Sequence, residues 1–394
     1  MRAEKIKKIY SLAFLFNFHL ALSSYINSTF LTNIIPEKYV GVLYTISSIL
    51  TLALLSKSAK ILKYFGNRKL TLIFLLFNIF SLIGLSFSVD PLIIGTSFVI
   101  FTTTNTLVMF CIDIFIEHWS DKNKTGETRG LYLTIVNLAI MISPLIASLI
   151  ITKEGGYKSI YLIALLLVII MTILFMSFIK KYKDKTYTRT AFVETFKYLK
   201  KSKHMFAISM VNFLLQFFYA WMVVYTPIYL YNHLGFTWDK IGIMFTVMLI
   251  PFVIIELPIG VIIDKYNFNK KIILSIGFII MIISTGIITF LPAYNWIIWI
   301  IILFITRVGA SIVEATNEIY FFTYIGDEDA SLLSIFRDMY PVAYIIAPII
   351  ATLIFLILPF KYLFITLSII MLSSFYFISK LKGKYENKLS NPNK

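Results

Sequence analysis

Residues 159–179, SIYLIALLLVIIMTILFMSFI, decide the fold class, because this stretch carries no charged side chain. A helix that crosses the hydrocarbon core of a membrane needs about 20 largely apolar residues. Lys158 and Lys180 flank the stretch directly, as expected where a helix leaves the membrane. We therefore predict a transmembrane helix over residues 159–179.

Comparable stretches continue on both sides of it. The 394 residues are 59% hydrophobic and 14% charged, whereas soluble domains carry about 45–50% apolar and about 25% charged residues. This composition excludes soluble nucleases, dehydrogenases and cytosolic scaffolds. The sequence predicts an all-α, polytopic membrane protein with twelve transmembrane helices, within residues 9–36, 39–56, 70–89, 91–112, 130–152, 159–179, 204–238, 241–263, 272–306 (two helices, folded at 291–295), 339–360 and 362–379.

The basic residues predict the orientation of these helices. With twelve spans both termini lie on one side of the membrane, and that side collects 30 of the 36 Lys and Arg residues. Short basic loops stay in the cytoplasm, so we expect both termini there, in a multi-pass protein of the cell (inner) membrane. The net charge of +16 then reflects topology and attraction to anionic lipid. It does not indicate nucleic acid.

The longest predicted connection, 180–203, divides the chain into two halves. Phe192, Phe196 and Leu199 share one helical face there, with lysines nearby, as in a short helix on the inner membrane surface. We predict two six-helix bundles, residues 1–179 and 204–382. The connection between them is a basic cytoplasmic linker, and residues 383–394 form a polar cytoplasmic tail.

The two halves also resemble each other in sequence, with three matches in the same order. Residues 143–150 match 347–354, Asp113 and Glu117 match Glu314 and Glu318, and residues 63–69 match 264–270. Parallel repeats of six helices are related by an axis along the membrane normal, and their substrate site lies between them near the midplane. The repeat therefore predicts two pseudo-symmetric bundles.

The loops after the second and eighth spans carry related motifs. The second-half loop has Gly260, Asp264, Lys270 and Lys271, and the first-half loop has Gly66, Arg68 and Lys69. Both resemble the Gly-x-x-x-Asp-x-x-Gly-x-(Arg/Lys)-(Arg/Lys) loop of the major facilitator superfamily, which implies a cytoplasmic gate. Ala59, Lys63 and Asn267 depart from that pattern. The first two departures leave open whether the first-half copy works as a charge lock.

Two more motifs support the resemblance, which covers nearly the whole chain. Arg307-Val-Gly-Ala310 is similar to the family's buried-arginine motif, and residues 139–148 are similar to its antiporter motif. The pattern of residues 139–148 recurs in the eleventh span, so it is alternatively explained by helix packing. The resemblance implies a secondary transporter that moves a small organic solute by alternating access, with export as one direction left open.

Arg307, Ser311, Glu314 and Glu318 share one face of the predicted tenth span. An arginine near the bilayer centre costs about 2.5–3.5 kcal/mol on insertion scales, so it should face protein, water or a counter-ion. In the functional interpretation, Arg307 binds an anionic group or controls the protonation of Glu314. In the structural one, it pairs with Glu314 or Glu256 and braces the bundle.

Asp113 and Glu117 lie one turn apart in the predicted fourth span. Two carboxylates in a medium of low dielectric disfavour simultaneous ionisation, which is suited to carrying a proton. Alternatively Glu117 and Arg129 resemble a charge network that latches the inner gate in sugar porters of the family. His19, midway along the first span, is either a proton relay or a hydrogen-bonded packing residue.

The resemblance also implies that the first, fourth, seventh and tenth helices line the substrate cavity. Its candidate contacts are polar residues on those helices, with packing as the alternative for the aromatic ones. They are Asn17, Asn105, Asn212, Gln216, Tyr219, Arg307 and Ser311.

The energy source is expected to be an ion gradient. The chain has no Gly-x-x-x-x-Gly-Lys-(Ser/Thr) loop for ATP, and buried carboxylates favour protons over another coupling ion. One cysteine and four scattered histidines predict no metal site, and we expect no cofactor. The expected partners are a solute, protons and the lipid bilayer, with the protein as a monomer. A lipid flippase of the same fold is the alternative. A multipass enzyme is disfavoured, because no nucleophile–base pair is evident.

Overall fold

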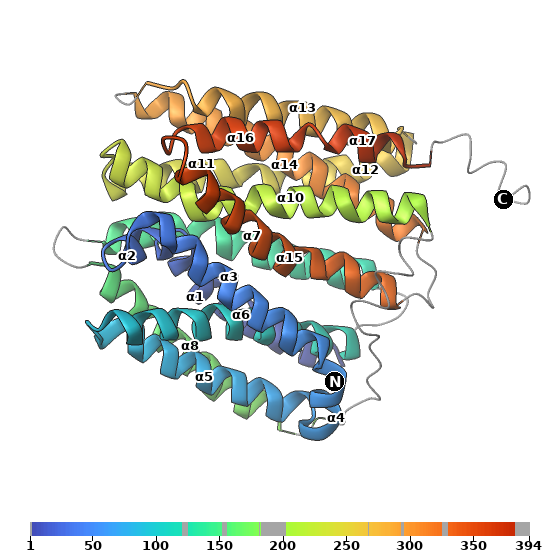
Figure 1. The fold of residues 1–394 in the computed structure, drawn as a ribbon. Helices are drawn as coiled ribbons and strands as arrows, with labels where there is room; N and C mark the ends of the chain where they lie inside the picture. The colour runs from blue at the N-terminus through green and yellow to red at the C-terminus, as the bar shows by residue number, and fades with distance from the viewer. Residues whose placement is uncertain are drawn as a thin grey trace, which may run out of the picture. The chain divides into compact units, whose positions relative to one another are not determined.

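The structure is a computed structural model that describes residues 2–119, 125–151, 156–180, 182, 202–266, 268–292, 295–324 and 330–382. Within these ranges every regular element is a helix (Figure 1). The predicted amphipathic helix around Phe196 and the tail 383–394 lie outside the described residues.

The helices follow the predicted apolar stretches. In the first part of the chain they are α1 (Arg2–Ser24), α2 (Asn27–Thr32), α3 (Glu37–Ser56), α4 (Ser58–Phe65), α5 (Asn67–Phe87), α6 (Pro91–Trp119), α7 (Thr125–Ile150) and α8 (Gly156–Phe178). The second part contains α10 (Lys203–Ile228), the π-helix η2 (Tyr229–His233), α11 (Trp238–Ile254), α12 (Glu256–Tyr266), α13 (Lys270–Ile288), α14 (Trp296–Tyr324), α15 (Ala330–Phe355), α16 (Tyr362–Met371) and α17 (Ser374–Ser379).

Ten helices within the described ranges are long and apolar enough to cross a membrane, and they coincide with ten of the twelve predicted spans. The first predicted span is divided into α1 and α2 around Tyr25 and Ile26. In the fifth predicted span, the apolar part of α7 is the shorter segment Thr134–Ile150. The all-helical fold is therefore confirmed, whereas the total of twelve spans and the side on which the termini lie stay predictions.

Helix α5 shows how the side chains are sorted. Asn78 and Ser81 are buried, whereas Phe80 is 67% exposed and Phe87 65% exposed. In water the apolar rings would be buried and the amide exposed. The reversed arrangement suits a helix whose outer face contacts lipid and whose polar side chains face the interior of the protein.

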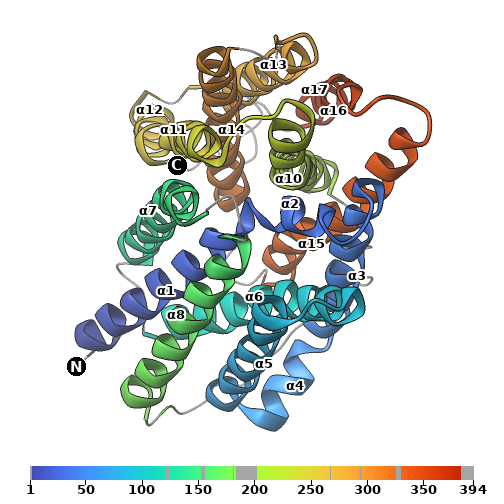
Figure 2. The same cartoon turned by 90° about the vertical axis from the view of Figure 1, so that its left-hand side faces the viewer.

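The chain forms two compact units. The first consists of residues 1–188 with 223–246, and the second of residues 189–222 with 247–394. In the first unit, α1 packs on α6, α7 and α8, and α5 packs on α6 and α8 (Figures 1 and 2). In the second unit, α14 packs on α12 and α13, and α13 also contacts α16 and α17. Helix α10 is joined to α15 by hydrogen bonds from Asn212 Nδ2 to the Phe336 carbonyl (2.7 Å) and from Trp221 Nε1 to the Ala347 carbonyl (2.6 Å).

Helices α13 and α14 approach each other closely at Gly277 and Gly309. A Cβ atom on Gly309 would lie 2.7 Å from the Gly277 carbonyl oxygen and 2.9 Å from the Met281 backbone nitrogen. These are backbone atoms, so only a separation of the two helices relieves the clash. Small residues allow such close approach of helices in membrane proteins. The contact at Gly309 lies two residues after Arg307 and holds this part of α14 against α13.

We predict that Gly309→Ala destabilises the protein by about 1–3 kcal/mol, the usual cost of overpacking a core. The control is Gly95→Ala, because a Cβ atom there meets only Leu43 Cδ2, at 3.8 Å. Thermal unfolding in detergent measures both variants. A midpoint lowered equally in the two, or in neither, contradicts the assigned packing.

Candidate functional site

The second unit contains a cluster of buried and half-buried polar residues on α10, α12 and α14. The Tyr219 hydroxyl on α10 donates a hydrogen bond to Glu314 Oε2 on α14, with 2.5 Å between the oxygens. The sequence analysis named both residues but gave no reason to pair them. The bond occupies one of the two carboxylate oxygens of Glu314.

Arg307 lies two helical turns before Glu314 on α14 and is only 1% exposed. Its guanidinium carbon is 5.1 Å from the ring centre of Phe218 and 5.7 Å from that of Tyr219. Such contacts stabilise a cation, but they satisfy no N–H donor in the ring plane. Nε and Nη1 are buried and have no hydrogen-bond partner within the described part of the chain.

Glu256 completes the cluster from α12. Helix α11 contains Pro251 and ends at Ile254, so that Glu256 becomes the first residue of a new helix. A carboxylate is favourable at that end of a helix. Glu256 interacts electrostatically with Glu314 and Glu318, and Glu314 interacts with Arg307. Several carboxylates thus share one buried cation, an arrangement that disfavours ionisation of all of them together.

The remaining predicted residues of α10 and α14 have other roles or positions. Ser311 is fully buried, and its hydroxyl donates to the Val308 carbonyl of its own helix (3.0 Å). Asn212 binds α15 as described above, and its Oδ1 accepts a long hydrogen bond from Gln216 Nε2 (3.5 Å). Glu318 is exposed. Asn212 therefore connects α10 to α15.

In the first unit, Asn78 on α5 forms a small buried polar network with α6. Its Nδ2 donates to Asn105 Oδ1 (2.8 Å), a predicted residue, and to the Thr104 hydroxyl (3.0 Å). His19 Nδ1 binds the Phe16 carbonyl (2.5 Å). This bond to its own helix suits a packing role for His19. The sequence analysis missed Asn78, although an amide inside an apolar span was a usable signal.

Two further predicted residues lie apart from that network. Asn17 is buried and donates to the Ala13 carbonyl of its own helix (2.8 Å). Asp113 is half-buried on α6. The side chains of Glu117 and Arg129, which the sequence analysis grouped with Asp113 or with the inner gate, lie outside those that the structure describes.

The residues of the gate motifs are in helix-terminal positions. Gly66, at φ +72°, separates α4 from α5, and Arg68 Nε donates a hydrogen bond to the Ile179 carbonyl just after α8. In the second copy, Lys271 Nζ donates to the Ser379 carbonyl (3.3 Å). Of the other members, Lys69 is exposed, and Gly260 and Lys270 are half-buried. The side chain of Asp264 is outside the described set.

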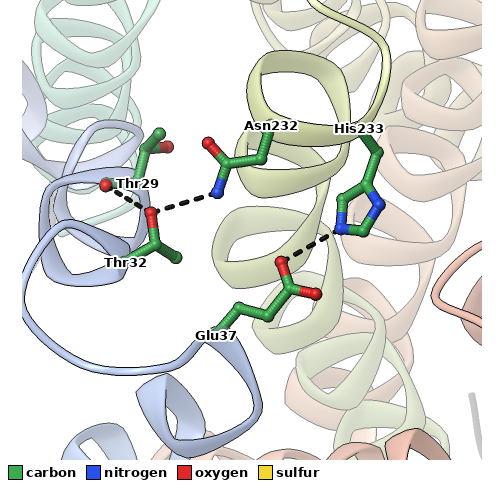
Figure 3. A network of polar contacts seen from close by, with 5 residues as sticks. All are labelled: Thr29, Thr32, Glu37, Asn232 and His233. Carbon is green, nitrogen blue, oxygen red and sulfur yellow. Dashed lines mark hydrogen bonds and ion pairs between the residues drawn. The ribbon is translucent and has the colours of Figure 1, made fainter.

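A second polar cluster, which we call the η2 network, joins η2 to α2 and α3 in the first unit (Figure 3). Asn232 Nδ2 donates to Thr32 Oγ1 (3.1 Å), which donates to the Thr29 carbonyl (2.7 Å). His233 Nε2 lies 3.0 Å from Glu37 Oε2 and forms an ion pair when protonated. The five-residue π-helix follows Pro227, and π-turns often occur at functional sites.

Residues 223–246 make more contacts within the first unit. Trp238 Nε1 donates to the Tyr157 hydroxyl (3.0 Å). A Cβ atom on Gly242 would lie 2.3 Å from Ser148 Cβ and 2.9 Å from the Pro144 carbonyl oxygen, so α11 touches α7 closely. The segment that follows Met222 is therefore held to α2, α3, α7 and α8 by the η2 network and by these contacts.

Comparisons with known proteins agree with this fold. A sequence model described as the Major Facilitator Superfamily matches residues 9–242 and 226–393. A structure of the nucleoside transporter NupG is 12% identical and covers 95% of this chain and 98% of its own, with a TM-score of 0.74. A variant of NupG gives 0.77 at 12% identity, covering 96% and 100%. The human organic anion transporter MFSD10 (TETRAN) gives 0.67 at 12% identity, covering 96% and 99%. No curated protein matches the chain.

Proposed function

Because the chain belongs to the major facilitator superfamily, we propose that it is a secondary transporter for a small organic solute, driven by protons. The cluster of Tyr219, Glu314, Arg307 and Glu256 carries this proposal. Charged groups inside membrane helices are costly and mark ion or substrate pathways. A purely structural cluster would pair every charge, whereas two donors of Arg307 have no partner among the described residues.

Glu314, with Glu256 beside it, is the proposed proton carrier. Arg307 and the Tyr219 hydroxyl stabilise the ionised form of Glu314, whereas burial favours the protonated form. These opposing influences balance the two states of the carboxyl group. A small change in the surroundings during transport then suffices to bind or release the proton.

The topology completes the proposal. We propose twelve spans, cytoplasmic termini and the bundles 1–179 and 204–382. In that topology the α2–α3 turn and the end of η2 would lie on the outer side of the cell membrane. There the η2 network would hold the outer side closed in one state and separate in the other. Asp113, Glu117 and Arg129 would belong to the inner gate, with Gly66, Arg68, Lys69, Gly260, Asp264, Lys270 and Lys271.

Transport by purified protein in liposomes tests the proposed function. A panel of labelled organic anions, cations and nucleosides is offered with an imposed pH difference. We expect at least one solute to accumulate above its equilibrium level, and a protonophore to abolish the accumulation. Fluxes equal to those of empty liposomes for the whole panel contradict the proposal. Solute-independent scrambling of labelled lipid would instead favour a lipid flippase.

A further inference from the structure

We propose that Arg307 binds an anionic group of the transported solute, and that this group binds together with a proton on Glu314. The proposal deepens the proposed function, on which it rests, by assigning the class of solute. That class is an organic anion whose charged group is attached to a flat or aromatic body.

The first argument is the unfinished hydrogen bonding of Arg307. A guanidinium group has five N–H donors in a plane, which match the oxygens of a carboxylate or sulfonate. Here Nε and Nη1 are buried and have no hydrogen-bond partner among the described residues. An unsatisfied buried donor costs free energy, and these two point to a ligand that supplies oxygen atoms.

The second argument is the aromatic surroundings of the guanidinium. Phe218 and Tyr219 are neighbours on α10, and both rings lie within 6 Å of the Arg307 guanidinium carbon. They cover the cation without using its in-plane donors. A solute that approaches those donors therefore also meets ring surfaces. This favours a benzoate-like or benzenesulfonate-like anion over a small inorganic one.

The third argument is the charge balance. When Glu314 is ionised, it compensates Arg307 electrostatically although its Oε2 accepts from Tyr219. When Glu314 takes up a proton, Arg307 loses the compensation that this carboxylate provides, and an anion from the solute replaces it. Proton and anion thus favour each other's binding, and this coupling is reciprocal.

The other titratable groups that face Glu314 do not change the sign of this coupling. In the described part of the chain they are Tyr219 on α10, Glu256 on α12 and Arg307 on its own helix, with Glu318 facing Glu256. Helix α13, which packs along α14, carries charge only at Lys270 and Lys271 in its first turn. Glu256 adds negative charge, which strengthens the need for a proton when an anion binds.

Binding of benzenesulfonate and benzoate to the purified protein tests the proposal without any transport. Their neutral amides, benzenesulfonamide and benzamide, serve as matched controls of nearly the same shape. We expect both anions, and neither amide, to raise the thermal midpoint of the wild type. The affinity for benzenesulfonate, which stays ionised, is expected to be at least about tenfold higher at about pH 6 than at about pH 8.

Three variants separate the roles of the residues. Arg307→Met replaces the buried cation with an apolar side chain of similar length and is expected to bind benzenesulfonate at least about tenfold more weakly. Glu314→Gln mimics the protonated carboxyl group and is expected to bind it tightly and independently of pH. Glu4→Gln makes the same change at an exposed position of α1, in the first unit, and should keep the pH dependence.

The outcomes are distinct. Equal shifts with anions and amides, no shift with either anion, or unchanged anion binding in Arg307→Met overturns the proposal. A pH dependence retained in Glu314→Gln overturns the coupling. If cationic or neutral solutes are transported and no anion binds, the proposed transporter function stands and the anion site at Arg307 is refuted. If anions bind and no solute is transported, the anion site stands and the transporter function is refuted.

Discussion

Glu314→Gln is expected to lose proton-driven accumulation of solute completely while it still exchanges solute across the membrane. Glutamine keeps the size of the side chain and a carbonyl oxygen that accepts from the Tyr219 hydroxyl, so the hydrogen bond of 2.5 Å has a replacement. It cannot bind or release a proton. Solute can then move only until its concentrations are equal on both sides.

Two liposome assays measure this result. Accumulation under an imposed pH difference should fall to the equilibrium level, whereas counterflow at equal pH should continue. Glu4→Gln, at an exposed position on α1 in the first unit, is the control and should accumulate solute as the wild type does. Normal accumulation by Glu314→Gln would show that the proton travels elsewhere, with Glu256, Asp113 and His19 as the next candidates.

The second large effect is expected from cross-linking the η2 network. Thr32 Oγ1 and Asn232 Nδ2 are 3.1 Å apart (Figure 3), so cysteines at both positions can be joined by a short, reducible thiol reagent. If transport requires these segments to separate, Thr32→Cys with Asn232→Cys stops transport after cross-linking and regains it on reduction. The native Cys111 is buried and does not compete.

Each single-cysteine variant with the same reagent serves as a control and should stay active. Glu37→Gln removes the ion pair with His233 but leaves the Asn232–Thr32 bond, so we expect only a modest change in rate, since exposed pairs contribute about 0–1 kcal/mol. Full activity of the cross-linked protein would mean that η2 and α2 stay together throughout transport. The outer gate would then lie elsewhere.

Much of the fold followed from charge-free segments and their flanking lysines. The hairpin of α13 and α14 was predicted from residues 272–306 with a turn at 291–295, because Pro292 and Asn295 interrupt an otherwise apolar run. The division of the first span into α1 and α2 was not predicted. No proline, glycine or charged residue marks Tyr25 and Ile26, and the flanking Ser23, Ser24, Asn27, Ser28 and Thr29 were the turn signal that the prediction did not use.

The candidate site was predictable only along single helices. The shared face of Arg307 and Glu314 follows from helical spacing, and Glu256 was identified as the one charge in an apolar run. The Tyr219–Glu314 bond was not predictable, because it depends on how α10 packs against α14. The same holds for Asn232 with Thr32 and His233 with Glu37, which are 200 and 196 residues apart.

Gly309, two residues after Arg307, shows another limit of prediction from sequence. Gly309 belongs to a motif that the sequence analysis connected with the buried arginine, but its contact with the backbone of α13 appears only in three dimensions. The motif therefore combines a charge with the glycine that lets two helices meet beside it. A periodicity argument sees the charged face of α14 and not its opposite, closely packed side.

Proton movement coupled to solute movement tests the central claim most directly. A pH-sensitive dye inside liposomes reports protons while the solute identified by the transport panel is added outside, with no pH difference imposed. The account predicts that the lumen acidifies with wild-type protein and that its pH does not change when Glu314 and Glu256 are both replaced by glutamine. Solute uptake by the wild type without any change in lumenal pH would contradict it.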